Sequence, residues 1–156
     1  MNPTTKIVLS TSLAACLAGC SLFLPREPTP EWQEATITSA SEQILWESAL
    51  LALEKEGYPL GIGIDRPAHT AESGWKVSLA PFKSMGWRQK ATVTYEEVEP
   101  DKYLTRVRVR RETNEDILHP LDPSYAKWEP AADVPDHALL ILRTIRSFIG
   151  EELELE

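Results

Sequence analysis

The chain contains two cysteines, Cys16 and Cys20, and their surroundings favour covalent modification over catalysis. Cys20 ends an uncharged run that begins at Ile7 and follows a single cation, Lys6. A secretory signal combines a positive first segment, an apolar core of about 7–15 residues and small residues before a cleavage point. Small residues stand directly before Cys20, so residues 1–19 are predicted to be a cleaved signal peptide.

The segment Leu17-Ala18-Gly19-Cys20 resembles the lipobox of bacterial lipoproteins, which has an aliphatic residue, two small residues and a cysteine. The resemblance implies cleavage between Gly19 and Cys20, a diacylglyceryl group on the Cys20 thiol and often acylation, as with palmitate, of the new amine. Two or more acyl chains hold a protein stably on a membrane, whereas one binds only marginally. Ser21 in place of Asp resembles the class destined for the outer membrane, which is therefore favoured over the inner membrane.

An uncleaved transmembrane helix is the alternative interpretation of the N-terminus. Residues 7–24 carry no charge and reach the minimum of about 18 residues for a membrane span. The polar residues Ser10, Thr11 and Ser12, together with Gly19, interrupt the apolar run. The complete four-residue motif at the end of that run favours the lipoprotein interpretation.

The composition of the remaining chain excludes several functions. Lys6 is the only charged residue in the predicted signal, so cleavage makes the formal net charge one unit more negative than −8. Such an acidic chain argues against nonspecific nucleic-acid binding, which needs a basic footprint. Cys16 leaves with the signal and Cys20 is used by lipid. The mature chain then has no thiol for a disulfide, a metal cluster or a nucleophile, and we expect no metal and no cofactor.

Cations alternate with mostly apolar residues along two predicted strands, 87–95 and 103–110. Successive side chains of a strand point to opposite faces, and a turn at 99–102 joins the two runs as an antiparallel pair. One face then holds the apolar residues and the other holds the cations. The predicted basic face comprises Arg88, Lys90, Arg106, Arg108 and Arg110.

Two interpretations of this basic face stay open. Five cations on one open face of an acidic protein indicate an anionic partner: a lipid headgroup, a glycan or an acidic protein surface. The other interpretation is an ordinary solvated face of a one-sided antiparallel sheet, compensated by Glu96 and neighbouring acidic residues.

The remaining chemistry-bearing residues do not favour an enzyme. His69, His119 and His137 lie far apart and match no metal-ligand spacing. The carboxylates of 96–99 and 115–116 are adjacent in sequence, so nothing predicts their convergence in a cleft. The Gly-x-Gly of residues 60–65 lacks the third glycine and the following helix of a dinucleotide loop.

Two helices are predicted to flank the strands. The first covers residues 39–56, where apolar residues recur at helical spacing, with Ser41 as N-cap and Gly57 at the end. The second opens at Asp133 or Asp136 with an apolar row on one side.

Strands are predicted over residues 58–112, including an alternating run at 60–64 where glycine allows close approach of another backbone. Residues 67–73 are predicted as a turn region. Residues 114–135 are predicted to be irregular because they contain four prolines.

The predicted order is helix, about four antiparallel strands, helix, which gives a two-layer α+β fold with both helices on one sheet face. This order, with the lipobox and a proline-containing spacer, resembles the helix-grip module of BamC-like lipoproteins of the outer-membrane β-barrel assembly machinery. The resemblance lies in element order and not in a residue motif, so it transfers no site residue.

The expected organisation is a signal peptide (1–19), a lipidated cysteine with a proline-rich spacer (20–34) and one periplasmic domain (35–156). We expect a lipid-anchored, non-catalytic binding or scaffold component of the cell envelope. Its partners would be the membrane, through Cys20, an envelope protein and an anionic lipid or glycan. The alternatives are a small-ligand or lipid carrier that uses a groove between helices and sheet, and an envelope enzyme of unfamiliar type.

Overall fold

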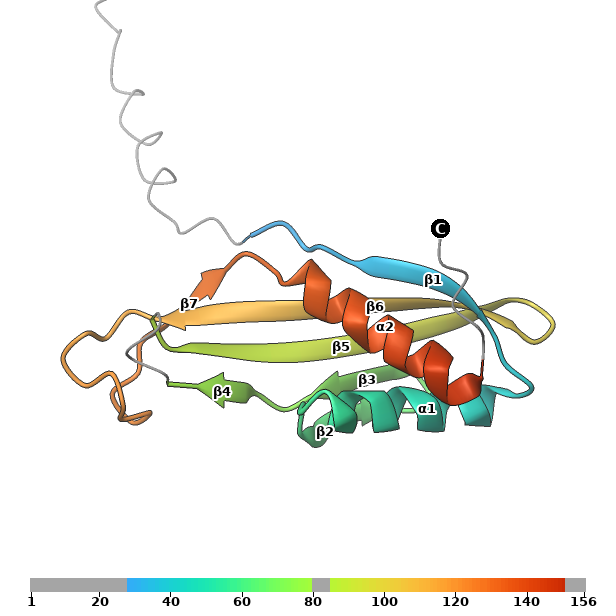
Figure 1. The fold of residues 1–156 in the computed structure, drawn as a ribbon, viewed down its shortest axis with the longest axis horizontal. Coiled ribbons are helices and arrows are strands. Elements are labelled where there is room, and N and C mark those ends of the chain that lie inside the picture. Colours follow the sequence, from blue (N-terminus) through green and yellow to red (C-terminus); the bar gives the residue numbers. More distant parts are fainter. Residues whose placement is uncertain (1–27, 80–84, 151–156) are drawn as a thin grey trace, which may run out of the picture.

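A computed structural model describes residues 28–79 and 85–150, among which it shows seven strands and two helices (Figure 1). The elements are β1 (Gln33–Thr38), α1 (Glu42–Lys55), β2 (Leu60–Asp65), β3 (Thr70–Ser73), β4 (Lys76–Ser78), β5 (Trp87–Glu99), β6 (Lys102–Asn114), β7 (Trp128–Ala131) and α2 (Pro135–Ile149). The predicted signal peptide, with Gly19 and Cys20, lies outside the described residues.

The seven strands form one antiparallel sheet built around the long hairpin of β5 and β6. The main strand order is β1-β6-β5-β3-β2, with β4 also paired to β5 and β7 also paired to β6. Each central strand therefore has two short neighbours along its outer edge: β3 and β4 beside β5, and β1 and β7 beside β6. Both helices lie on the same face of the sheet (Figure 1).

The predicted fold class is wrong. The described residues form a sheet-rich fold with seven strands, not a helix–sheet–helix arrangement with about four, and a strand precedes α1. Another strand, β7, lies in the segment that was predicted to be irregular. The helix-grip interpretation rested on that element order, so it is not supported.

The missed strands are short and carry weak apolar patterns. In β1 only Ile37 is fully buried, and β3 contributes only Ala71 to the core. β7 contains Pro130, which cannot donate a ladder hydrogen bond and is tolerated because this strand pairs only with β6. Pairing with a long central strand, and not intrinsic preference, makes these segments extended.

The first helix agrees with its predicted signals. The Ser41 side chain accepts a hydrogen bond from the Ile44 backbone N–H at 3.3 Å, as an N-cap should. Gly57 follows the helix at φ +76°, a conformation that glycine adopts without strain. In α2 the N-cap is Val134, without a side-chain hydrogen bond, so neither Asp133 nor Asp136 caps it as predicted.

The long hairpin confirms the predicted pairing of its two strands. Its register places Ala91 opposite Val109 and Val93 opposite Val107, all of them buried. Asp101 adopts φ +63° in the connecting turn, which lies where the sequence predicted it. Alternation along these strands sends one set of side chains toward the helices and the other toward the opposite face.

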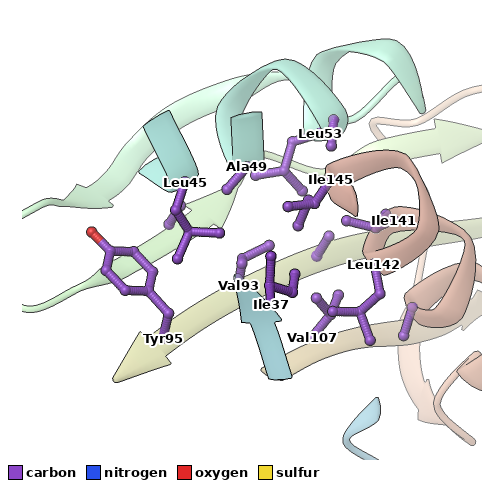
Figure 2. Packing of buried hydrophobic residues seen from close by; sticks show 14 of the residues in the cluster. Ile37, Leu45, Ala49, Leu53, Val93, Tyr95, Val107, Ile141, Leu142 and Ile145 are labelled. Atoms are coloured by element: carbon purple, nitrogen blue, oxygen red, sulfur yellow. The ribbon is translucent and has the colours of Figure 1, made fainter. Parts of the chain in front are cut away.

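The core fills the space between the two helices and the sheet (Figure 2). Leu45, Ala49 and Leu53 of α1 meet Ile141, Leu142 and Ile145 of α2 above Ile37, Val93 and Val107 of the sheet. Gly63 of β2 lies so close to β3 that a Cβ atom there would stand 2.8 Å from the Glu72 Cβ. This close approach confirms the predicted role of glycine in β2.

Candidate functional site

The five cations of the predicted basic face lie on the sheet face turned away from the helices. Lys90 stands opposite Arg110 across the β5–β6 ladder, and Arg88 stands opposite Glu112. Arg106 and Arg108 face Thr94 and Thr92 in the same ladder. The structure therefore brings the predicted residues together on one surface.

Four of the five cations are paired with carboxylates that approach from neighbouring elements. These ion pairs are Arg88–Glu112 at 2.6 Å, Lys90–Glu72 at 2.8 Å, Arg106–Glu34 at 3.0 Å, Arg106–Glu96 at 2.9 Å and Arg108–Asp133 at 2.6 Å. Most of the positive charge on this face is thus compensated locally. Attraction for a distant anion is correspondingly weaker than five unpaired cations would give.

Arg110 is the exception within the described residues, because none of their carboxylates lies within ion-pair distance of it. Its guanidinium instead lies 5.7 Å from the ring centre of Trp75. Arg88 and Lys90 approach the same ring at 4.3 and 5.0 Å, and Arg88 also contacts Trp128 at 4.9 Å. Cation–π contacts leave the charge available to an anion, whereas an ion pair neutralises it.

A groove of about 400 Å³ opens beside Arg110. One wall comes from β6 and β7, and the other from the segment before β1. Its lining residues are Pro28, Thr29, Pro30, Arg108, Arg110, Arg111, Glu112, Pro130, Ala131 and Asp133. The end of the predicted spacer therefore packs against the basic face.

Asp133 joins three parts of the molecule at this groove. Its side chain is only 1% exposed. One carboxylate oxygen accepts a hydrogen bond from the Glu31 backbone N–H at 2.9 Å and from Arg108 Nε at 2.6 Å. The carboxylate predicted as a helix cap instead fixes the spacer and β6 to the start of α2.

A second polar cluster lies on the helix side of the sheet. Gln89 is buried there, and its Oε1 lies 3.1 Å from the Tyr58 hydroxyl and 3.0 Å from His137 Nδ1. The Lys76 ammonium lies 4.9 Å from the centre of the Tyr58 ring and donates to the Glu56 carbonyl at 2.6 Å. These contacts hold together a small polar cluster, here called the polar island, of Tyr58, Lys76, Gln89 and His137 at the edge of the apolar core.

Burial sets the protonation of this cluster. Desolvation, with the nearby Glu56 carboxylate, raises the pKa of Tyr58 to about 12. Desolvation and the cations Lys76 and Arg111 lower the pKa of His137, so its imidazole is neutral at pH 7. An adjoining cavity of about 90 Å³, lined by Glu56, Tyr58, Lys76, His137 and Leu140, is small beside a ligand site of about 300–1,000 Å³.

Sequence reasoning placed Asp133 at the start of the second helix but missed its contacts with Glu31 and Arg108, and it missed this cluster. The position of Gln89 among inward-facing residues was a usable signal, because a buried amide needs partners. His137 lies in the first turn of α2, and its partners Tyr58 and Gln89 come from distant segments, which no local pattern indicates. His69 stacks on Tyr95 with ring centres 4.8 Å apart, and His119 stacks on Tyr125 at 4.4 Å.

Residues 28–79 and 85–150 contain no cluster of three histidine, cysteine or acidic side chains arranged to hold a metal ion. Within the same ranges, neither helix is long and apolar enough to cross a membrane.

The chain matches no family model and no curated protein. Among solved structures, it is similar to the adenylate sensor of AMP-activated protein kinase, which was crystallised in complex with 5-aminoimidazole-4-carboxamide 1-β-D-ribofuranotide. The similarity has a TM-score of 0.43 and 13% sequence identity, and it covers 72% of this chain and 94% of the sensor chain. A likeness at this level carries no inference about function.

Proposed function

We propose that this chain is a lipid-anchored periplasmic protein that acts as a non-catalytic binding or scaffold component of the cell envelope, on the outer membrane in preference to the inner. The observation that carries the proposal is the motif Leu17-Ala18-Gly19-Cys20 at the end of an apolar run. Lipid on Cys20 would hold the domain at the membrane surface and raise its effective concentration for partners there.

The surface that we propose for binding is the groove beside Arg110, bounded by β6, β7 and residues 28–30. Arg110 combines a charge left unneutralised by the described carboxylates with an aromatic neighbour, Trp75. Such a pair recognises an anionic group: a lipid headgroup, an acidic glycan or a carboxylate on a protein. The other four cations position their own carboxylate partners and shape the face.

The same packing argues against the carrier alternative. A carrier of the type considered would hold its ligand between the helices and the sheet. That space is occupied by buried side chains of α1, α2 and the central strands. The 400 Å³ groove lies elsewhere, beside β6, β7 and the spacer.

The anchor is tested with a Cys20→Ala variant in cells fed radiolabelled palmitate. We expect the wild-type chain to take up label and float with membranes, and the variant to do neither. Continued labelling of the variant would contradict the lipoprotein proposal.

The binding surface is tested separately by crosslinking in intact cells, with Arg110→Glu against Lys102→Glu as the matched control. Lys102 is also a cation of β6 but lies in the hairpin turn region, paired with Glu99. We expect Arg110→Glu alone to lose crosslinked partners, with wild-type capture weakening at high salt. Equal partner profiles for both variants would remove the groove from the proposal.

A further inference from the structure

The loop that joins β6 to β7, residues 115–127 and here called the apolar loop, exposes several large apolar side chains. Ile117 and Leu118 are each 80% exposed, Leu121 is 63% exposed and Tyr125 is 56% exposed. Single exposed apolar residues are ordinary on soluble proteins. Their concentration in one short loop is instead typical of an interaction surface.

The apolar loop is ordered by its own polar groups. Asn114 Oδ1 accepts hydrogen bonds from the backbone N–H groups of Asp116 and Lys127, each at 3.0 Å. Asp116 Oδ1 accepts from the backbone N–H groups of Leu118 and His119 at 2.8 and 2.9 Å. These bonds lower the pKa of Asp116, whose side chain is only 11% exposed. The Asp116 carboxylate, near the start of the loop, thus turns inward, while the apolar side chains point outward.

The apolar loop lies at the end of the sheet where the spacer arrives. It runs directly into β7, and Pro130 and Ala131 of β7 line the same groove as Pro28 and Pro30. The β5–β6 turn lies at the opposite end of the sheet (Figure 1). Cys20 precedes Pro28 by eight residues, which span at most about 29 Å when fully extended at about 3.6 Å per residue.

From this placement we infer that the apolar loop inserts into the lipid bilayer beside the anchor. Ile117, Leu118 and Leu121 enter the boundary between headgroups and acyl chains, and the amphipathic ring of Tyr125 lies at headgroup level. The inference rests on the proposed lipid on Cys20, which brings this end of the sheet within reach of the membrane. A second contact of this kind would fix how the domain stands on the membrane.

The test uses the full-length protein, lipidated in cells, purified and reconstituted into phosphatidylcholine–phosphatidylethanolamine vesicles. A Leu118→Cys variant carries an environment-sensitive NBD fluorophore, since the mature lipidated chain has no other free thiol. The matched control is Val98→Cys, an exposed apolar position near the hairpin turn at the far end of the sheet. Flotation of the vesicles reports the anchor independently of the fluorophore.

We expect the label at residue 118 to show blue-shifted emission and quenching by lipids spin-labelled near the glycerol backbone. The label at residue 98 should stay green-shifted and be quenched by aqueous iodide. Protein that floats while the residue 118 label remains open to iodide overturns the loop insertion and leaves the anchor intact. Protein that fails to float overturns the anchor. Protection of residue 118 in native envelopes but not in protein-free vesicles assigns the loop to a protein partner and overturns insertion.

Discussion

The two faces of the β5–β6 hairpin are made by alternate residues of the same strands, yet they are held in opposite ways. On the helix side, Val93, Val107 and Val109 are buried against two helices. On the far side, Arg106 and Arg108 are held by carboxylates from β1, β5 and the segment before α2. The first face is stabilised by the removal of apolar surface from water, and the second by individual ion pairs.

This difference predicts where stability and where binding reside. Buried apolar packing contributes several times more per residue than a half-exposed ion pair. The helix side should therefore determine whether the chain folds. The far side can change its charges at lower cost in stability, except at Asp133, which is buried like a core residue.

The largest expected effect comes from the helix side. Leu142→Ala removes a side chain that is 2% exposed in α2 and should lower the free energy of unfolding by about 2–5 kcal/mol. Leu140→Ala, in the same helix but 45% exposed, should cost less than about 1 kcal/mol. Urea unfolding of both variants gives the comparison. Similar losses would mean that burial is not what makes Leu142 important for stability.

One ion pair on the far side, Arg108–Asp133, is buried and should contribute more to stability than the exposed pairs. Asp133→Asn keeps the shape of the side chain but removes the charge that faces Arg108, and should cost about 2–3 kcal/mol. Glu34→Gln removes one partner of Arg106 at an exposed position and should cost less than about 1 kcal/mol. A double-mutant cycle with Arg108→Ala isolates the coupling. A coupling energy near zero would make Asp133 an ordinary surface acid.

A smaller effect is expected from the polar island on the helix side. The pKa of His137 is lowered from its ordinary value of 6.5 in the folded chain, so the unfolded chain takes up a proton at higher pH. Its contribution is therefore fully present above pH 6.5 and is lost as the pH falls below that value. Urea unfolding between pH 7.5 and 5.5 should show this loss in the wild type. His137→Gln should flatten the slope, and an unchanged slope in this variant would contradict the assignment to His137.

The smallest effect is expected where aromatic rings meet cations on the far side. Trp75→Leu removes the ring shared by Arg88, Lys90 and Arg110 and should cost about 0.5–1 kcal/mol. Trp75→Phe keeps an aromatic face and should recover part of the loss in thermal unfolding. If both variants lose the same amount, the ring contributes packing alone.

The sequence predicted well what depends on neighbouring residues. Ser41 and Gly57 mark the ends of α1, and alternation from residue 87 to 110 marks the central hairpin and its two faces. These signals are local, since a cap or a period is complete within a few residues. The same alternation grouped five cations correctly but said nothing about their partners.

What the sequence did not predict depends on distant pairing. Thr70–Ser73 and Trp128–Ala131 become strands because β5 and β6 offer unpaired edges to them. Asp133 carries an ordinary cap signal, yet its oxygen is taken by Arg108 and Glu31, 25 and 102 residues away. Local patterns in the sequence therefore could not predict the number of strands or the carboxylates that neutralise the basic face.

The bond from the Glu31 backbone N–H to Asp133 has a consequence for encounter with a partner. A domain on a freely rotating tether samples many orientations and must lose that freedom when it binds. With the proposed lipid on Cys20, residues 28–31 would form the end of the tether, and their contacts along the groove would restrict the orientation of the domain before any partner arrives. Association at this face would then depend mainly on diffusion of the partner to the groove and less on rotation of the domain. Breaking the bond between Glu31 and Asp133 would restore that rotation and lower the association rate.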